Sequence, residues 1–73
     1  MTFEKGDRIK IVYGEREVEG EVVIGSHNNA ALMISFDAML GGHVGVMPVL
    51  VHDQERGIYH SIIDGTEVRI QLA

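Results

Sequence analysis

Cysteine and tryptophan are absent from the chain, and proline occurs once in 73 residues. Without cysteine, neither a disulfide nor a thiolate–metal site can reinforce the fold. With two tyrosines, two phenylalanines and no tryptophan, the chain is also poorly equipped for an aromatic groove or an aromatic cage. Stability must therefore come from apolar burial, for which a composition of 45% hydrophobic residues is adequate, and a second copy of the chain would add to it.

Basic residues are scarce. Six Lys and Arg oppose eleven Asp and Glu, which gives a net charge of −5, and neither half of the chain is basic. A surface that follows a phosphate backbone or an anionic membrane normally gathers basic side chains, so binding to nucleic acid and to membranes is disfavoured. The longest apolar run, residues 46–51, is far shorter than the roughly 20 residues of a membrane span.

No linker, repeat or low-complexity tract divides the chain, which predicts a single domain over residues 1–73. The first residues show no hydrophobic stretch of the secretory type. Together with the lack of cysteine, this leads us to expect a cytoplasmic protein.

Apolar and polar residues alternate with a period of two, which is typical of strands with one solvated face. The alternating segments are residues 9–13, 18–24, 32–36 and 68–72. Turn-forming residues separate the strands at 14–16, 25–29, 41–43, 52–57 and 64–65. Short strands at this spacing, with no helical window, predict an all-β fold: a small SH3-like barrel of five or six antiparallel strands.

Two segments leave alternatives open. Asp64-Gly65 suits a two-residue hairpin turn that would place Val68 opposite Ser61, whereas residues 61–64 could instead form a 3₁₀ turn before the last strand. Residues 37–43 could form one helical turn or a loop, with Met39 and Leu40 folded over one end of the barrel.

The strand over residues 44–51 is apolar on both faces. Val44, Val46, Pro48 and Leu50 share one face, and Met47, Val49 and Val51 share the other. A strand of this kind is buried on both sides, although a small barrel has one interior. We therefore predict a homo-oligomer interface formed by Met47, Val49 and Val51, joined by Val23. The alternative is that residues 37–43 cover this face within one chain.

The opening of the chain resembles KOW-type and other SH3-like barrels. Residues 5–14 (KGDRIKIVYG) and 20–23 (GEVV) provide the Gly-Asp start, the alternating first strand and the Gly-x-Val second strand of those families. The resemblance implies an SH3-like barrel with a 3₁₀ turn before its last strand. KOW elements that bind RNA usually display basic residues near this hairpin, where the present chain has Glu17, Glu19 and Glu21.

Metal binding and catalysis find little support in the sequence. His27, His43, His52 and His60 lack the spacings of two or four residues that place two ligands together. His43 and His52 flank one strand and would lie roughly 30 Å apart. We predict no metal site within one chain, leaving a symmetric site between chains open, and no cofactor.

His60, Ser61 and Asp64 have the residue types of a nucleophilic triad. Because adjacent strand residues point to opposite faces, His60 and Ser61 would diverge. We therefore do not predict an enzyme.

The expected function is a small non-catalytic binding module that self-associates and recognises a protein or peptide. The expected binding loops contain Ser26, His27, Asn28, Asn29, Asp37, Gly42 and His43. The row of Glu15, Glu17, Glu19 and Glu21 is interpreted as a solvated face, with docking of a basic partner as its alternative. The alternative function is an RNA-binding or translation-associated module, as the KOW-like opening implies.

Overall fold

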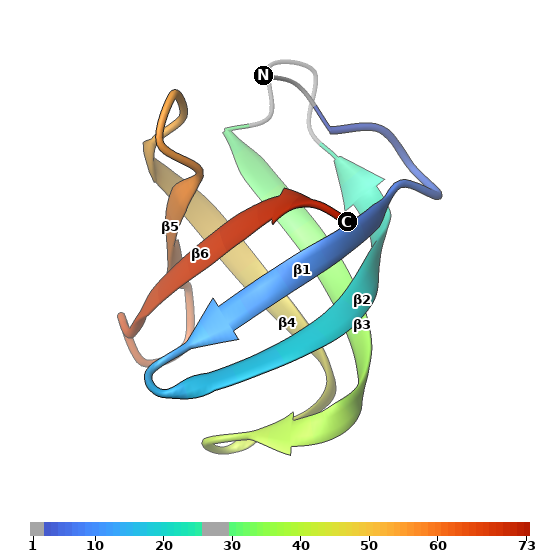
Figure 1. Cartoon of the computed structure of the whole chain (residues 1–73). Helices are drawn as coiled ribbons and strands as arrows, with labels where there is room; N and C mark the ends of the chain where they lie inside the picture. The colour runs from blue at the N-terminus through green and yellow to red at the C-terminus, as the bar shows by residue number, and fades with distance from the viewer. Residues whose placement is uncertain (1–2, 26–29) are drawn as a thin grey trace.

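The computed structural model describes residues 3–25 and 30–73 and folds them into six strands, with no helix in these ranges (Figure 1). The strands are β1 (Arg8–Tyr13), β2 (Arg16–Gly25), β3 (Ala31–Leu40), β4 (His43–Asp53), β5 (Ile58–Ser61) and β6 (Glu67–Leu72). In this part of the chain no helix is long and apolar enough to cross a membrane.

Each strand pairs antiparallel with the next, and β6 returns to pair with β1, so that the sheet closes into a barrel (Figure 1). The closing pairs run from Ile9 opposite Leu72 to Tyr13 opposite Val68. The predicted all-β fold is confirmed, and the closed antiparallel barrel is consistent with a small SH3-like barrel. Closure satisfies the backbone groups that an open sheet would expose at its two edges.

Alternation along the strands builds the core, because every second side chain points into the barrel. The buried core residues are Phe3, Ile9, Ile11, Val22, Leu32, Ile34, Phe36, Leu40, Met47, Val49, Tyr59, Val68 and Ile70. Gly20 belongs to the same inward row of β2, and its missing side chain lets the strands approach closely. A Cβ atom there would lie 2.2 Å from the carbonyl oxygen of Ser35.

The β3–β4 hairpin corrects the expectation for residues 37–43. These residues extend β3 to Leu40, turn at Gly41-Gly42 and begin β4 at His43. Leu40 enters the core, whereas Met39 is exposed. The helical turn and the loop are both wrong because strand pairing continues to the hairpin tip, where the positive φ of Gly41 permits a two-residue turn.

The connection between β5 and β6 spans residues 62–66. Tyr59 pairs with Val68, so the register expected of a two-residue Asp64-Gly65 turn is wrong. The Gly65 N–H donates to the Ser61 carbonyl at 2.9 Å, which makes the turn one residue wider than a 3₁₀ turn. Of the two alternatives, a turn that begins at Ser61 is the nearer description.

Candidate functional site

The outer surface of β6, β1 and β2 is charged. Its outward side chains include Arg8, Lys10, Glu17, Glu19, Glu21, Glu67 and Arg69. Arg8 Nη2 lies 3.7 Å from Glu19 Oε2, and Lys10 Nζ lies 3.4 Å from Glu17 Oε1. Exposed pairs of this kind add little stability. They do place a carboxylate beside each basic side chain that faces outward on β1.

The outer surface of β3 and β4 carries no charge over most of its length. Its outward side chains are Ala31, Met33 and Ser35 on β3, and Val44, Val46, Pro48 and Leu50 on β4. Val44, Val46 and Leu50 are 68%, 50% and 49% exposed. We call these seven positions the apolar face. Contiguous exposed apolar surface of this kind is typical of protein interaction sites.

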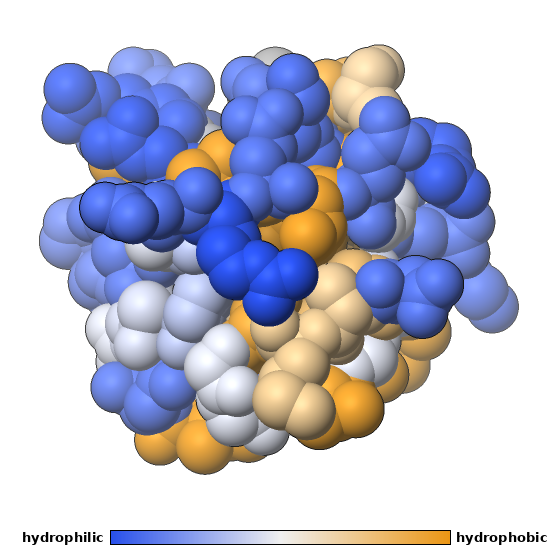
Figure 2. Space-filling model, turned by 60° about the horizontal axis from the view of Figure 1, so that its bottom comes forward, coloured by the Kyte–Doolittle hydropathy of each residue, from blue (hydrophilic) through white to orange (hydrophobic). Residues whose placement is uncertain are grey.

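Figure 2 shows the division of the surface. The front of Figure 1, which carries β6 and β1, turns toward the top of this view, and hydrophilic side chains gather there. Apolar side chains gather over the lower part, toward which the back of Figure 1 turns. The barrel therefore has a charged side and an apolar side.

A row of apolar residues crosses the apolar face from β2 to the turn after β5. The register places Ile24 beside Met33 and Met33 beside Pro48, and the Ile62 N–H donates to the Pro48 carbonyl at 2.9 Å. Ile24 points outward next to a register shift in β2. Ile24, Met33, Pro48 and Ile62 help line a shallow hollow of about 290 Å³ with almost no polar surface.

The predicted oligomer interface was assigned to the wrong face of β4. Met47 and Val49 are fully buried, so neither can contact a second chain. Their direction follows from the register, because Met47 pairs with Ile34 and Val49 pairs with Leu32, which are both core residues of β3. The side chains that point outward are those of the opposite face of β4, Val44, Val46, Pro48 and Leu50.

The two remaining interface residues are also set back from the surface. Val51 packs partly buried against the core, and Val23 is half-buried. The apolar surface that is exposed on β4 includes Val46 and Leu50 instead.

The residues of the expected binding loops do not form one surface among the described residues. Ser26, His27, Asn28 and Asn29 lie outside the described ranges. Asp37 is exposed on β3 and Gly42 is exposed in the turn that follows it. His43 is 5% exposed, and its ring faces the β5–β6 turn, so its assignment to a binding loop is wrong.

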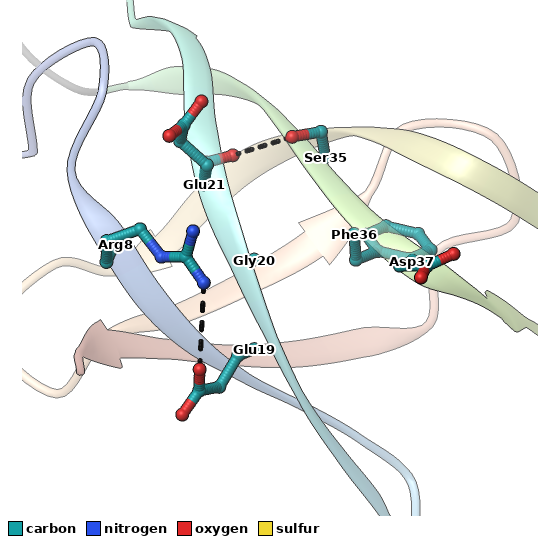
Figure 3. Close-up of a pocket in the computed structure, with 7 residues that line it drawn as sticks. All are labelled: Arg8, Glu19, Gly20, Glu21, Ser35, Phe36 and Asp37. Carbon is teal, nitrogen blue, oxygen red and sulfur yellow. Dashed lines mark hydrogen bonds and ion pairs between the residues drawn. The ribbon is translucent and has the colours of Figure 1, made fainter.

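Asp37 helps to line a hollow of about 320 Å³ on the charged side (Figure 3). Its other lining residues are Arg8, Glu19, Gly20, Glu21, Ser35 and Phe36. Figure 3 shows Arg8 reaching toward Glu19, while the Ser35 hydroxyl points to the Glu21 carbonyl oxygen, at 3.5 Å. Three carboxylates against one guanidinium leave the hollow negative. Its chemistry suits a basic side chain.

His43, Ser61 and Asp64 form the main polar cluster in the barrel wall. The Ser61 hydroxyl and Asp64 Oδ2 lie 3.1 Å and 3.3 Å from the same ring nitrogen of His43, Nε2. A nucleophilic triad requires the serine and the carboxylate on opposite ring nitrogens. Ser61 is 3% exposed, and its hydroxyl oxygen accepts the N–H of Ile63 at 3.2 Å. The cluster therefore fixes the β5–β6 turn against the start of β4.

Asp64 remains a carboxylate in this cluster. The Thr66 N–H donates to Asp64 Oδ1 at 2.9 Å, and this bond is the main reason that the pKa of Asp64 falls from 3.8 to about 2. The Tyr13 hydroxyl also donates to Asp64 Oδ2, at 3.4 Å. The charge of Asp64 is thus held mainly by Thr66, with Tyr13 and His43 as further neighbours of Oδ2.

Sequence reasoning missed two features. The first is the outward apolar face, because both alternating sets of β4 are apolar. The second is a pair of histidines, His52 and His60, whose ring centroids lie 4.7 Å apart. Pairing of β4 with β5 brings them together, a relation that the spacing of histidines along the sequence does not reveal. Within residues 3–25 and 30–73, no group of three or more His, Asp or Glu residues is placed to hold a metal ion.

The chain was compared with protein-family models, with curated proteins and with solved structures, and none of the three comparisons found a match. Any account of its function therefore depends on the geometry described above.

Proposed function

We propose that this protein is a small non-catalytic binding module that self-associates through the apolar face of β3 and β4. The observation that carries the proposal is the contiguous set of seven outward, uncharged positions on these two strands. Such a surface gains free energy when it leaves water, in proportion to the apolar area covered.

A second copy is the favoured occupant on grounds of charge. Each chain has a net charge of −5, and two such chains repel when their charged sides meet. The apolar face places no carboxylate against its own copy. A standard interface covers about 800 Å² per partner. That area is just under a fifth of the 4499 Å² surface of the chain.

Self-association would leave the charged side of the barrel free for a protein or peptide. The negative hollow lined by Glu21 and Asp37 adjoins the apolar face at Ser35, which belongs to both. It offers a place for a basic side chain of that partner at the edge of the contact. Recognition by strand addition is disfavoured because the barrel is closed. The RNA-binding alternative gains no support here, because Arg8 and Lys10 already lie beside Glu19 and Glu17.

The test is the mass of the protein in solution, measured by light scattering after size-exclusion chromatography. We expect an oligomer for the wild type and a monomer for Val46→Lys and Leu50→Lys, because each lysine places a charge in the apolar face. Val12→Lys is the matched control, since Val12 lies outward on β1 beside Arg69 and Glu17. Far-ultraviolet circular dichroism checks that every variant is folded.

Two results contradict the proposal. One is a wild type that stays monomeric at about 1 mM. A protein that is half associated at this concentration gains only about 4 kcal/mol from association, so a monomer there has an even weaker contact. The other is an oligomer that Val46→Lys and Leu50→Lys leave unchanged while Val12→Lys disrupts it, which would place the contact on the charged side.

A further inference from the structure

The rings of His52 and His60 lie next to each other on the outer face of the β4–β5 hairpin. Their centroids are 4.7 Å apart, and the ring planes are inclined by 34°. His52 is exposed and His60 is half-buried, so both rings can be reached from solvent. Two imidazole rings, each with a nitrogen able to bind a metal ion, therefore lie next to each other at the surface.

A β-bulge places His52 beside His60. Leu50 pairs with His60 and Val51 with Tyr59, but the next pair joins Asp53 to Ile58. The register therefore shifts at His52, which is the extra residue on β4. A bulge of this kind changes the direction of a side chain relative to a regular strand, and such bulges are frequent beside functional sites.

We propose that His52 and His60 together bind a divalent transition-metal ion that prefers imidazole ligands, with Zn²⁺ as the representative. With metal–nitrogen bonds of about 2.1 Å, and ring centres about 1.1 Å beyond each nitrogen, two ligating rings have centroids roughly 4.5–5.2 Å apart at bond angles of about 90–109°. The observed 4.7 Å falls within this range. Pairing of β4 with β5, together with the bulge at His52, brings the two rings to this separation.

The neighbouring carboxylates are engaged elsewhere. Asp53 Oδ1 accepts the backbone N–H of Arg56 at 3.3 Å. Glu67 lies opposite His60 on the neighbouring strand β6, and its Oε2 atom lies 3.6 Å from Arg69 Nε. The two imidazoles are therefore the protein ligands, and water fills the remaining positions of the metal. This ligand set selects against Mg²⁺ and Ca²⁺, which prefer oxygen ligands. The proposal does not depend on self-association.

Isothermal titration calorimetry of the full chain with Zn²⁺ tests the proposal, with Ca²⁺ as the comparison ion. We expect saturable binding of Zn²⁺, no binding of Ca²⁺, and a loss of affinity of about tenfold or more in both His52→Gln and His60→Gln. His27→Gln is the matched control and should bind as the wild type does. Both variant positions lie at the surface, so folding should be retained.

Nuclear magnetic resonance of the imidazole rings locates the ion. Addition of Zn²⁺ should shift the ring signals of His52 and His60 together and leave those of the buried His43 in place. The proposal is overturned if either glutamine variant binds Zn²⁺ within about threefold of the wild type, or if the two ring signals do not respond. In that case the rings are in van der Waals contact only.

Discussion

Replacing Met47 and, separately, its neighbour Val46 by alanine tests which face of β4 is inside. Met47 is fully buried and Val46 is 50% exposed. Removing a buried methionine side chain costs about 2–5 kcal/mol, because the cavity adds to the lost transfer free energy. Replacing an exposed valine on a strand by alanine lowers the free energy of unfolding by about 0.5 kcal/mol or less.

The magnitude for Met47→Ala is large on the scale of the whole molecule. At about 0.05–0.15 kcal/mol per residue, a chain of 73 residues has a free energy of unfolding of roughly 4–11 kcal/mol. Met47→Ala should therefore remove a large share of the stability, and the urea midpoint should fall accordingly.

Urea unfolding followed by circular dichroism gives both values. Each protein is measured at two concentrations tenfold apart, because a contribution from self-association would shift the midpoint with concentration. The assignment of faces is refuted if Val46→Ala is the more destabilising change at the lower concentration. That result would mean that Met47 and Val49 point outward and that Val46 points into the core.

Three further predictions follow from single contacts. Gly20→Ala should lower the free energy of unfolding by about 1–3 kcal/mol in urea titrations, because the added alanine Cβ would meet the Ser35 carbonyl oxygen. A variant as stable as the wild type would contradict the close approach of β2 and β3. Tyr59→Phe should raise the melting temperature, with a gain of about 1 kcal/mol, because the buried Tyr59 hydroxyl has no hydrogen-bond partner among the described residues; a loss of stability would reveal one. Asp64→Asn should be less stable than the wild type at neutral pH. The pKa of Asp64 is lowered from 3.8 to about 2, so the difference in free energy of unfolding between the two proteins should be present above pH 3.8 and shrink as the pH falls toward 2. A difference that is constant with pH would show that the charge of Asp64 is not involved.

Alternation with a period of two was sufficient to predict the all-β barrel and most of its strands, but not the hairpin tip at residues 37–43, where β3 ends and β4 begins. Polar residues mostly alternate with apolar ones on β1, β2 and β6, and there polarity indicates the direction of most side chains, although the apolar Val12 and Ile24 point outward. On β4 this information is missing, since Val46 and Met47 are both apolar. Only the register with Ile34 and Leu32 decides which of the two points inward, and pairing across strands is not encoded in the pattern of a single strand.

The candidate sites depended still more on contacts between distant residues. His43 looked like a loop residue because Gly41 and Gly42 precede it, but the β5–β6 turn reaches it from 18 residues away through Ser61. The pairing of His52 with His60 likewise requires a bulge whose position the sequence pattern does not mark. In both cases the side chains acquire their neighbours through contacts between different elements, which the pattern of a single strand does not record.

Pairing of β6 with β1 has a consequence for how the chain folds. Five hairpins can form between strands that follow each other in the sequence. The pairing of Ile9 with Leu72, in contrast, requires a loop of 63 residues to close. Closing a loop of that length carries an entropy term of roughly 4 kcal/mol beyond a constant. We therefore expect a slow folding step governed by this final pairing, and a truncation that removes β6 should leave β1 and β5 with unpaired backbone that promotes aggregation.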